Sequence, residues 1–489
     1  GGLGVVKSGA GTLTLSGQNA NETWAGINTF SGGMTLNQGV LQVNTPMGLG
    51  GGPVLNGQPV ALGTPGATFA TTGDLNLVGG TLNLRSDGGM SNGTIILGNP
   101  TTNGVRVNVR GPVTISVDRL AANAGNAFQI GDLNLSENTL TVSGGANEYR
   151  LRVAGATTIQ GTFANVSNTV ATELVGVVAG PGALNKLGGS TWPLVLSNPG
   201  NTYSGGTNIV SGMVQSTVTT GTPFGTGPVK VFGGPGAGTL RLAGVGGLGG
   251  APLRVMSGIN SMGVVLLDNS FDPSSILTPA SFGSPYGTLL QSGVPFFTQA
   301  LDMSAIGDGR AFLASGVQAG NSEAAYVATS LGAGAPDQFS AVAGQPVYRL
   351  VSGQYNGLTG SMSLALSGSD NVLTNRGGVP TFLQVGTTLA NVVNSNQFGQ
   401  IGGVALRNAN NFTGGTQIAK SNTVTVETGG GPAGLSALGT GPVEVYGVLQ
   451  TGASAGFGVG SFFNAATGQN TNPIVLRLGG VVIINDIQG

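Results

Sequence analysis

A pattern of seven residues that occurs three times limits what this chain can fold into. It reads Asn, a polar residue, an aromatic residue, a hydroxyl residue, two glycines and then Met or Thr, at Asn28–Met34, Asn201–Thr207 and Asn410–Thr416. The first copy runs on into alternating apolar and polar residues, Thr35-Leu36-Asn37 and Val40-Leu41-Gln42-Val43. Paired glycines predict a turn, and the alternation that follows predicts a half-buried β-strand. The chain therefore repeats one turn-and-strand unit.

Two further landmarks follow each copy in the same order. The tripeptide Gly-Pro-Val begins at Gly52, Gly227 and Gly441, although another copy at Gly111 makes it a weak marker alone. A β-branched run then follows at 93–99, 263–269 and 480–486. Repetition with a long period indicates modules rather than chance similarity. We divide the chain into a first module at 1–181, a second at 182–400 and a partial third at 401–489.

The repeated residues are expected to be structural anchors. An asparagine side chain bonds readily to backbone groups at a turn, and an aromatic ring beside it packs inward. Glycines allow tight corners. The anchors we predict are Asn28, Phe30, Gly32, Gly33, Asn201, Tyr203, Gly205, Gly206, Asn410, Phe412, Gly414 and Gly415.

Composition narrows the class of protein. Glycine makes up 92 of 489 residues without a Gly-X-Y period, which excludes collagen. Charged residues are only 7% against 39% hydrophobic residues, so the chain does not resemble a disordered protein of high net charge. Few charges also favour self-association. The net charge is −1 and lysine occurs only at positions 7, 186, 230 and 420, so we expect no nucleic-acid partner.

Residue types that are missing exclude several kinds of site and anchor. The chain has no cysteine and no histidine, so it has no disulfides and lacks the best ligands for zinc and copper. No apolar run is long enough for a transmembrane helix. The sequence begins Gly1-Gly2 and its third module is incomplete, which we interpret as a piece of a longer polypeptide.

Many short strands separated by Gly, Asn or Pro are compatible with a sandwich, a barrel or a solenoid. The internal repeats favour the solenoid, because each coil buries its apolar side against its neighbours. We therefore predict an all-β solenoid, with a loop-rich insertion at about 268–337 in the second module. Glu323–Tyr326 is expected to form a short helix there.

The residues of the first module are also similar to a known repeat. Val6–Gly17, which contains Lys7 and Gly-Thr-Leu-Thr-Leu-Ser-Gly, and Asn28–Val43 closely resemble the autotransporter-associated β-strand repeat of bacterial passenger domains. The similarity is good around 201–214 and partial around 410–426. The resemblance implies a right-handed parallel β-helix in an extracellular protein of the bacterial cell surface. It supplies no catalytic residues.

Few residues are grouped in a way that indicates chemistry. Asp268 lies near Asp272, and Asp302 lies near Asp308 and Arg310. Such carboxylates could hold Ca²⁺ with backbone carbonyls, but aspartate more often bonds its own backbone in a turn. A serine triad is excluded because there is no histidine. We therefore predict no catalytic residue, no cofactor and no metal site.

These observations leave three hypotheses about function. The leading one is an extracellular structural protein that self-assembles into a fibre, sheath or surface layer through its solenoid ends. The assembly candidates are Val481, Val482, Ile483 and Ile484, because an apolar edge strand is a template for another chain. The alternative is a passenger-type adhesin that acts as a monomeric stalk and displays the insertion at 268–337 to a host or surface glycan. A carbohydrate-active β-helix enzyme is the third.

Overall fold

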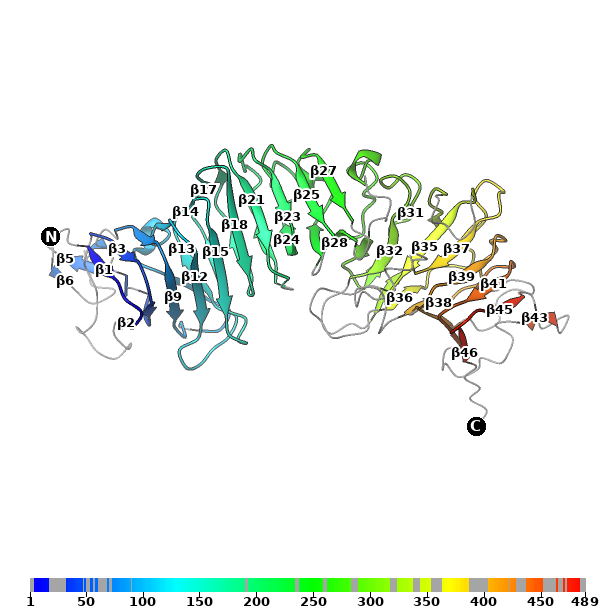
Figure 1. Cartoon of the computed structure of the whole chain (residues 1–489), viewed down its shortest axis with the longest axis horizontal. Coiled ribbons are helices and arrows are strands. Elements are labelled where there is room, and N and C mark those ends of the chain that lie inside the picture. The colour runs from blue at the N-terminus through cyan, green and yellow to red at the C-terminus, as the bar shows by residue number, and fades with distance from the viewer. Residues whose placement is uncertain are drawn as a thin grey trace. The chain divides into compact units, whose positions relative to one another are not determined.

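The computed structural model describes residues 4–483, with gaps at 17–31, 47, 50–52, 56–57, 60–67, 70–72, 89, 190–191, 234–236, 258–261, 283–288, 317–322, 337–343, 353–362, 387–402, 421, 428–436, 452–462, 465–468 and 471–472. The chain divides into two compact units. Unit 1 comprises residues 1–230 and 246–252, and unit 2 comprises residues 231–245 and 253–489. Each unit is built from parallel β-strands (Figure 1).

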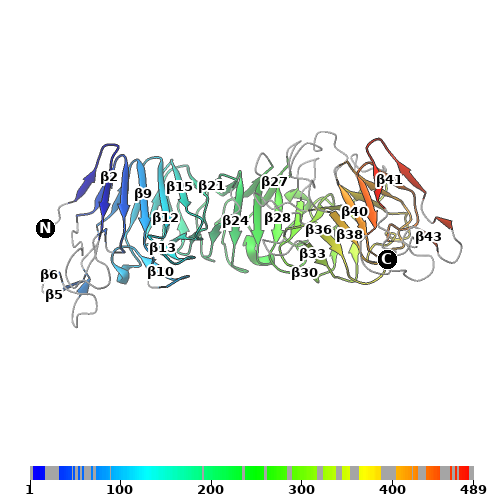
Figure 2. The ribbon, with the colours of Figure 1, turned by 90° about the horizontal axis from the view of Figure 1, so that it is seen from below.

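Unit 1 contains three parallel sheets, and the chain visits them in turn. The first sheet has the order β1 (Val5–Lys7), β3 (Met34–Leu36), β8 (Leu75–Leu77), β11 (Val107–Val109), β14 (Leu133–Leu135), β17 (Thr157–Ile159) and β20 (Val178–Ala179). The second has the order β2 (Thr12–Leu15), β4 (Val40–Val43), β9 (Gly80–Arg85), β12 (Val113–Asp118), β15 (Thr139–Gly144), β18 (Phe163–Asn168), β21 (Ala183–Leu187) and β23 (Thr207–Ile209). The third has the order β10 (Thr94–Ile96), β13 (Ala127–Ile130), β16 (Arg150–Val153), β19 (Thr172–Leu174), β22 (Leu194–Leu196) and β24 (Gly212–Ser216). Figure 2 shows these strands stacked in successive layers.

The core of unit 1 consists of columns of apolar side chains that stack from coil to coil. Residues at equivalent positions of successive first-sheet strands are paired in register. One such column, in which every side chain is at most 2% exposed, is Leu36, Leu77, Val109, Leu135 and Ile159. Burying an aliphatic side chain of this size stabilises the fold by about 1.5 to 3 kcal/mol. The alternating sequence thus sends one set of residues inward and the other outward.

Smaller elements complete unit 1. Strand β5 (Pro53–Leu55) pairs antiparallel with β6 (Gln58–Pro59) and β7 (Thr68–Phe69), apart from the three main sheets. A 3-10 helix, η1 (Pro100–Thr102), is capped by Asn99. Two elements cross the boundary between the units. They are β25 (Val229–Phe232) and the 3-10 helix η2 (Val245–Leu248).

Unit 2 continues the parallel design in two main sheets. Its long sheet has the order β26 (Gly238–Leu242), β28 (Val264–Leu267), β29 (Leu289–Ser292), β32 (Phe312–Ser315), β35 (Val347–Val351), β37 (Phe382–Val385), β39 (Thr416–Ile418), β41 (Val443–Val445) and β45 (Ile474–Leu476). Its second sheet has the order β30 (Phe296–Phe297), β33 (Glu323–Tyr326), β36 (Ser363–Leu366), β38 (Gly403–Leu406), β40 (Thr423–Val426), β42 (Val448–Thr451) and β46 (Val481–Ile483). The remaining elements are β27 (Leu253–Met256), η3 (Pro279–Ser281), β31 (Leu301–Asp302), β34 (Leu331–Gly332), β43 (Phe463–Asn464) and β44 (Gln469–Asn470).

The prediction of an all-β parallel solenoid is confirmed. The segment 268–337 contributes strands β29, β30, β32 and β33 to the two main sheets of unit 2, with loops between them. The expected helix at Glu323–Tyr326 was wrong, because these residues form β33. Ala325 pairs with Phe296 of β30 on one side, and both alanines pair with β36 on the other. Burial in a sheet has overridden the helical propensity of alanine.

Copies of the repeat do not start on the same face of the solenoid. The strand after the first Gly-Gly pair, β3, lies in the first sheet of unit 1, whereas the strand after the second pair, β23, lies in the second sheet. The residues before β23 run beside β20 instead, since Thr202 N donates to Val178 O over 2.8 Å. The repeat thus specifies a corner and the strand that follows it. It does not determine which sheet of the solenoid that strand joins.

Candidate functional site

The repeat builds a corner that joins three successive coils through one buried asparagine. Asn201 is 1% exposed. Its Oδ1 accepts a hydrogen bond of 2.7 Å from Val178 N of the preceding coil, and its Nδ2 donates over 2.7 Å to Pro223 O of the following coil. Three-coil bridging of this kind satisfies backbone groups that would otherwise be buried without partners.

Asn410 of the third copy makes the same arrangement in unit 2. Its Oδ1 accepts from Leu373 N over 2.9 Å, and its Nδ2 donates to Ala437 O over 2.9 Å. The side chain is 2% exposed. The two copies thus place an asparagine in the same environment, although their neighbouring coils differ in sequence.

The aromatic residue of each described copy points into the core. Tyr203 and Phe412 are both 0% exposed. The Tyr203 hydroxyl lies 2.6 Å from Thr207 Oγ1, and burial raises the pKa of this phenol well above its usual value. The Phe412 ring meets Tyr348 edge to face, with a centroid distance of 6.2 Å. The next coil bonds to the backbone of both aromatics, through Thr226 N and Thr440 N.

The two glycines of the corner lie between neighbouring coils. A Cβ on Gly205 would lie 2.3 Å from Ala183 N, and one on Gly414 would lie 2.5 Å from Thr381 O, both in the preceding coil. A Cβ on Gly206 would lie 2.4 Å from Pro228 O of the following coil, and φ is +84° there. Real side chains do not tolerate such distances to backbone atoms. Close stacking therefore requires glycine.

The contact at Gly206 also explains the Gly-Pro-Val landmark. Pro228 O accepts from Thr207 N over 2.9 Å, and Pro442 O accepts from Thr416 N over 2.8 Å. Gly-Pro-Val is thus the segment that stacks on Gly-Gly in the next coil. The first copy departs from this plan, because Asp74 O accepts from Met34 N there, while Pro53 and Val54 lie in the antiparallel strand β5.

The structure describes only the last three residues of the first copy, Gly32–Met34. Asn28 and Phe30 lie outside the described residues. Gly32 is exposed. Gly33 is buried with φ at +79°, and a Cβ there would lie 2.6 Å from Asp74 O. The second glycine of this copy therefore meets the following coil as Gly206 does.

Two lysines of the repeat lie inside the solenoid, a role that the sequence interpretation missed. Lys186 is 0% exposed and stacks between Val166 and Ile209. Its Nζ donates to Leu187 O over 2.6 Å and to Gly188 O over 3.0 Å, and burial lowers the pKa of this amine to about 8. Lys7 is 8% exposed and donates in the same way, to Gly9 O over 2.6 Å. The sequence feature that could have predicted this burial is the lysine that precedes a Gly-rich turn in the first two copies.

The third copy replaces the lysine. Val385 occupies the equivalent position opposite the strand that follows the Gly-Gly pair, and it is 0% exposed. In the first copy a Cβ on Gly39 would lie 2.7 Å from Lys7 Nζ, so glycine makes room for the ammonium group. The third copy has Asn422 directly before β40, and Asn422 Nδ2 donates to Lys420 O over 3.1 Å. In the third copy the side-chain amide of Asn422 thus donates to a corner carbonyl, as the lysine ammonium does in the other copies.

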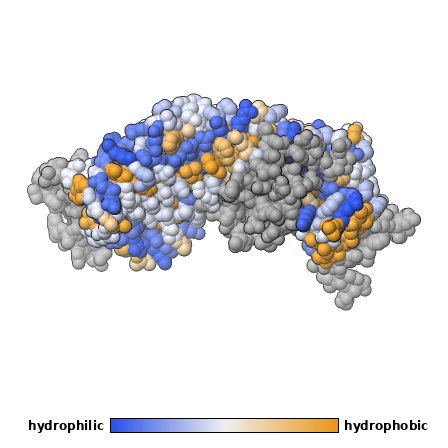
Figure 3. Space-filling model, in the orientation of Figure 1, coloured by the Kyte–Doolittle hydropathy of each residue, from blue (hydrophilic) through white to orange (hydrophobic). Residues whose placement is uncertain are grey.

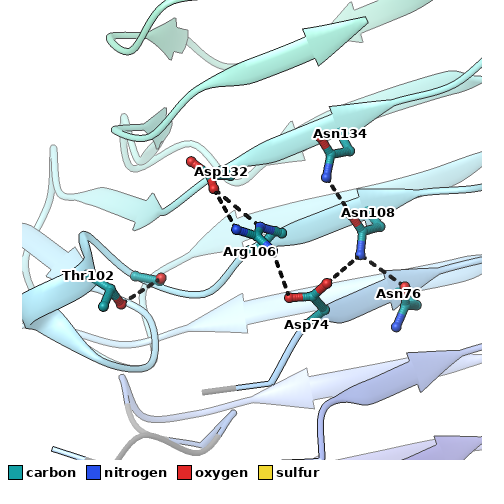
Figure 4. Close-up of polar contacts among 8 residues, drawn as sticks. Asp74, Asn76, Thr102, Arg106, Asn108, Asp132 and Asn134 are labelled. Carbon is teal, nitrogen blue, oxygen red and sulfur yellow. Dashed lines mark hydrogen bonds and ion pairs between the residues drawn. The ribbon is translucent and has the colours of Figure 1, made fainter. Parts of the chain in front are cut away.

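A ladder of polar side chains follows the outer surface of the first sheet (Figure 4). Asn134 Nδ2 donates to Asn108 Oδ1 over 2.7 Å, and Asn108 Nδ2 donates to Asn76 Oδ1 over 3.0 Å. Arg106 lies between two carboxylates, 3.2 Å from Asp132 and 3.7 Å from Asp74. The signal for the ladder was the tetrapeptide Asp-Leu-Asn-Leu, which occurs at 74–77 and again at 132–135.

This ladder is satisfied by its own members. Amide groups bond in a chain along the stack, as in other stacked parallel sheets. The Arg106 guanidinium is balanced by two carboxylates that are 40% and 44% exposed. Exposed ion pairs of this kind contribute about 0 to 1 kcal/mol each. The arrangement holds neighbouring coils in register, and its single arginine and two carboxylates together carry a net charge of −1.

The carboxylates singled out in the sequence are engaged in local structure. Asp272, Asp302 and Asp308 each accept a hydrogen bond from the backbone N–H two residues later. Asp268 instead forms an ion pair with Arg241. Burial raises the pKa of Asp308, which also contacts Arg310 at 3.4 Å. Within the described residues no group of three or more acidic side chains is placed to hold a metal ion.

The assembly candidates lie on the last described strand of unit 2. β46 pairs with β42, and its side chains Val481 and Ile483 are 46% and 39% exposed. Leu478, just before this strand, is 100% exposed. Figure 3 shows hydrophobic surface where Figure 1 places β46. Val482 is half-buried, and Ile484 lies outside the described residues.

Comparison with known families agrees with the corner geometry. The family model described as the passenger-associated-transport-repeat matches residues 5–43 and 184–215. Two segments of this chain are passenger-associated transport repeats. The second match contains Asn201, Tyr203 and both corner glycines, and it begins close to the buried Lys186. The resemblance seen in the sequence is therefore confirmed.

A curated relative carries the same indication. The chain is 28% identical over 243 residues to a protein named adhesin BmaC autotransporter, from Brucella suis biovar 1 (strain 1330). The match covers 43% of this chain and 7% of that adhesin's length. No solved structure matches the chain. With its passenger repeats, this is a secreted protein of the bacterial cell surface. Among the described residues no helix is long and apolar enough to cross a membrane.

Proposed function

We propose that this chain is part of the passenger of a bacterial adhesin and serves as a monomeric β-helical stalk whose side faces contact a target surface. The observation that carries the proposal is the position of the passenger repeat. Its second match includes the corner that bridges three coils in unit 1, so the repeat marks the scaffold itself. The relative named as an adhesin supports a role in attachment.

The proposed role is not enzymatic. Glycoside cleavage requires a pair of carboxylates that face a common substrate. Here Asp272, Asp302 and Asp308 each bond backbone within their own turns. Asp268 is paired with Arg241. These groups stabilise loops of unit 2.

Attachment can be tested with the whole chain. Beads coated with the purified protein are washed over animal epithelial cells under flow, beside beads coated with serum albumin. We expect more of the protein-coated beads to be retained, and soluble chain to compete for the same sites. Equal retention of both kinds of bead would contradict the adhesin proposal.

A second candidate function is self-assembly through the solenoid end. The specific observation in its favour is the exposed apolar strand β46, since a strand edge can add a strand from another molecule. Deleting Gly479–Gly489 should then abolish ordered polymers formed by the wild-type chain. Polymers that persist in the deletion variant would exclude this mechanism.

A further inference from the structure

The outer face of the second sheet in unit 1 carries a regular array of uncharged polar side chains. Strands β9, β12, β15 and β18 lie side by side here (Figure 1). In one row, successive strands contribute residues that are paired in register and partly exposed. These are Thr81, Thr114, Thr141 and Ser167.

A second row lies two residues further along each strand. Its members are Asn83, Ser116 and Ser143. We call these seven residues the polar grid. Side chains two residues apart on a strand point to the same side, so both rows face outward. The residues between them, including Leu82 and Ile115, are 0% exposed and face the core.

The hydroxyl groups of the polar grid are available for a ligand. On the same face of this sheet the amides bond one another, as Asn208 does to Asn185 and Asn185 does to Asn165. Within the grid, Asn83 Nδ2 donates to Gln42 Oε1. By contrast, the hydroxyls of Thr81, Thr114 and Thr141 form no hydrogen bond with any described residue. They keep a free donor and acceptor each.

The spacing of the polar grid favours an extended repeating partner. Neighbouring strands in a sheet lie about 4.8 Å apart, which is close to the length that one pyranose residue adds to an extended sugar chain. A linear polysaccharide laid across the strands would therefore meet a new hydroxyl at every coil. None of the seven grid residues is charged. The nearest cation on this face, Arg85 at the end of β9, is paired in register with Asp118, so the grid offers no unpaired positive charge to a polyanionic chain.

We infer that the polar grid binds a linear, neutral polysaccharide that lies across the strands, with about one sugar residue per coil. This inference rests on the proposed adhesin function and assigns its ligand class and its face. Each hydroxyl contact contributes little alone, about 0.5 to 1.5 kcal/mol net. Repetition along one ligand supplies the affinity, since linked contacts act at high effective concentration.

The test measures binding of the whole purified chain to soluble polysaccharides by affinity electrophoresis and calorimetry. The probes are mixed-linkage β-glucan, galactomannan and linear dextran, with heparin as the polyanionic comparison. We expect binding to at least one neutral probe, little binding to heparin, and affinity that rises with the length of its oligosaccharides. No binding to any neutral probe, or tighter binding to heparin, would overturn the inference.

A double variant locates the site. Thr114→Val with Thr141→Val removes two grid hydroxyls while keeping β-branched side chains that suit a strand. The affinity should fall by about tenfold, as expected for two lost hydrogen bonds. Thr158→Val, a partly exposed threonine on the first sheet, is the matched control and should bind as the wild type does. Unchanged binding by the double variant, with an unaltered circular dichroism spectrum, would exclude this face.

The outcome separates the inference from the function on which it rests. If coated beads adhere to cells while no neutral polysaccharide binds, only the ligand assignment fails. If neither binding is found, the adhesin proposal fails with it.

Discussion

At the scale of single residues, the corner asparagines explain why the repeat begins with Asn. Only a side chain with both an acceptor and a donor can bond the coil before and the coil after at once. Asn201 and Asn410 do this with different partners in the two units. Aspartate would lack the donor, and serine would be too short to reach both coils. The repeat therefore begins with asparagine because this position must accept a hydrogen bond from the preceding coil and donate one to the following coil.

The neighbouring asparagines Asn410 and Asn411 allow this to be tested within one unit. Asn410→Ala leaves Leu373 N and Ala437 O buried without a partner, which should lower the free energy of unfolding by about 2 to 4 kcal/mol. Asn411 is exposed, so Asn411→Ala should change it by less than about 0.5 kcal/mol. Urea denaturation followed by circular dichroism measures both, and equal effects would contradict the bridging role.

The corner glycines are tested by a similar pair in unit 1. Gly206→Ala places a Cβ 2.4 Å from Pro228 O at a φ of +84°. Gly250 has a φ of +81° and nothing within 4 Å of its Cβ position. Both alanines suffer about 1 to 2 kcal/mol of backbone strain, but Gly206→Ala should lose about 1 to 3 kcal/mol more from the clash. Similar urea midpoints for the two variants would show that only backbone conformation matters.

The buried lysine predicts an unusual pH dependence. Burial lowers the pKa of Lys186 in the folded chain to about 8, from a value of 10.5. Between these two values the unfolded chain binds the extra proton, so the stability of the wild type should rise with pH across this window. Below pH 8 both states are protonated, and the folded state bears the full cost of the buried charge, about 3 kcal/mol.

The matching variant is Lys186→Met, which keeps the shape of the side chain and removes the charge. The free energy of unfolding of the variant minus that of the wild type should be about 3 kcal/mol larger at pH 7 than at pH 10.5, because only the wild type is destabilised by a buried charge at pH 7. Tryptophan fluorescence in urea at a series of pH values gives this difference, and groups common to both proteins cancel in it. A difference that does not vary with pH would contradict the account of Lys186.

Sequence reasoning at this scale found the residue types and missed their partners. That Asn201 and Tyr203 are anchors follows from their repetition, but the identity of Val178 and Pro223 as partners depends on which coils become neighbours. Coil length varies along the chain, so sequence distance does not reveal this. The burial of Lys186 was equally hidden, because lysine is rarely buried and its partners are backbone carbonyls.

At the scale of elements, one charged clip holds three strands of unit 2 together. Arg407, which follows β38, contacts Glu323 of β33 at 2.6 and 2.8 Å and Glu427, which follows β40, at 2.6 Å. Its side chain is 35% exposed, less than the 52% of Arg106 on the first sheet of unit 1. Partial burial and paired hydrogen bonds make such a contact stronger than an exposed ion pair.

The two arginines form a matched pair of variants. Arg407→Gln should lower the free energy of unfolding by about 1 to 3 kcal/mol, because two partly buried carboxylates lose their partner. Arg106→Gln should cost less than about 1 kcal/mol, since its ion pairs are exposed and screened by solvent. Thermal unfolding followed by circular dichroism compares them. A larger loss for Arg106→Gln would show that exposure does not govern these contacts.

Strand prediction succeeded where apolar and polar residues alternate and failed where both faces are buried. Alternation of apolar and polar residues predicts the strands at Leu75–Leu77 and Leu133–Leu135. In β33 the residues Ala324 and Ala325 are both buried, so no alternation is visible and the alanines indicated a helix instead. At β5 the sequence pattern is present but the structure differs. Gly-Pro-Val lies there in an antiparallel pair, whereas in the other copies it stacks on the Gly-Gly corner.

At the scale of the whole molecule, the low charge of the sequence has a structural reason. Most positions in a stacked parallel coil contact another coil, and a charge there would have to be buried or paired. Outward positions are filled largely by Thr, Ser and Asn, as in the polar grid, so few charges are needed for a polar surface. The composition that favoured self-association in the sequence analysis is therefore equally compatible with a monomer that displays neutral faces.

The modules at 1–181, 182–400 and 401–489 remain a prediction about sequence repetition. The compact units divide the chain instead near residues 230 to 253, where it passes between the two units three times. Repeats define similar corners, whereas units are defined by which coils contact one another. Sequence similarity alone could not reveal the latter.

The most direct test of the adhesin proposal against the fibre alternative is cryo-electron microscopy of the purified whole chain at neutral pH. The account predicts separate molecules whose sheets are built from parallel coils, with the second-sheet face of unit 1 open to solvent. Ordered filaments, with density continuous from β46 of one molecule into the first coil of the next, would contradict it.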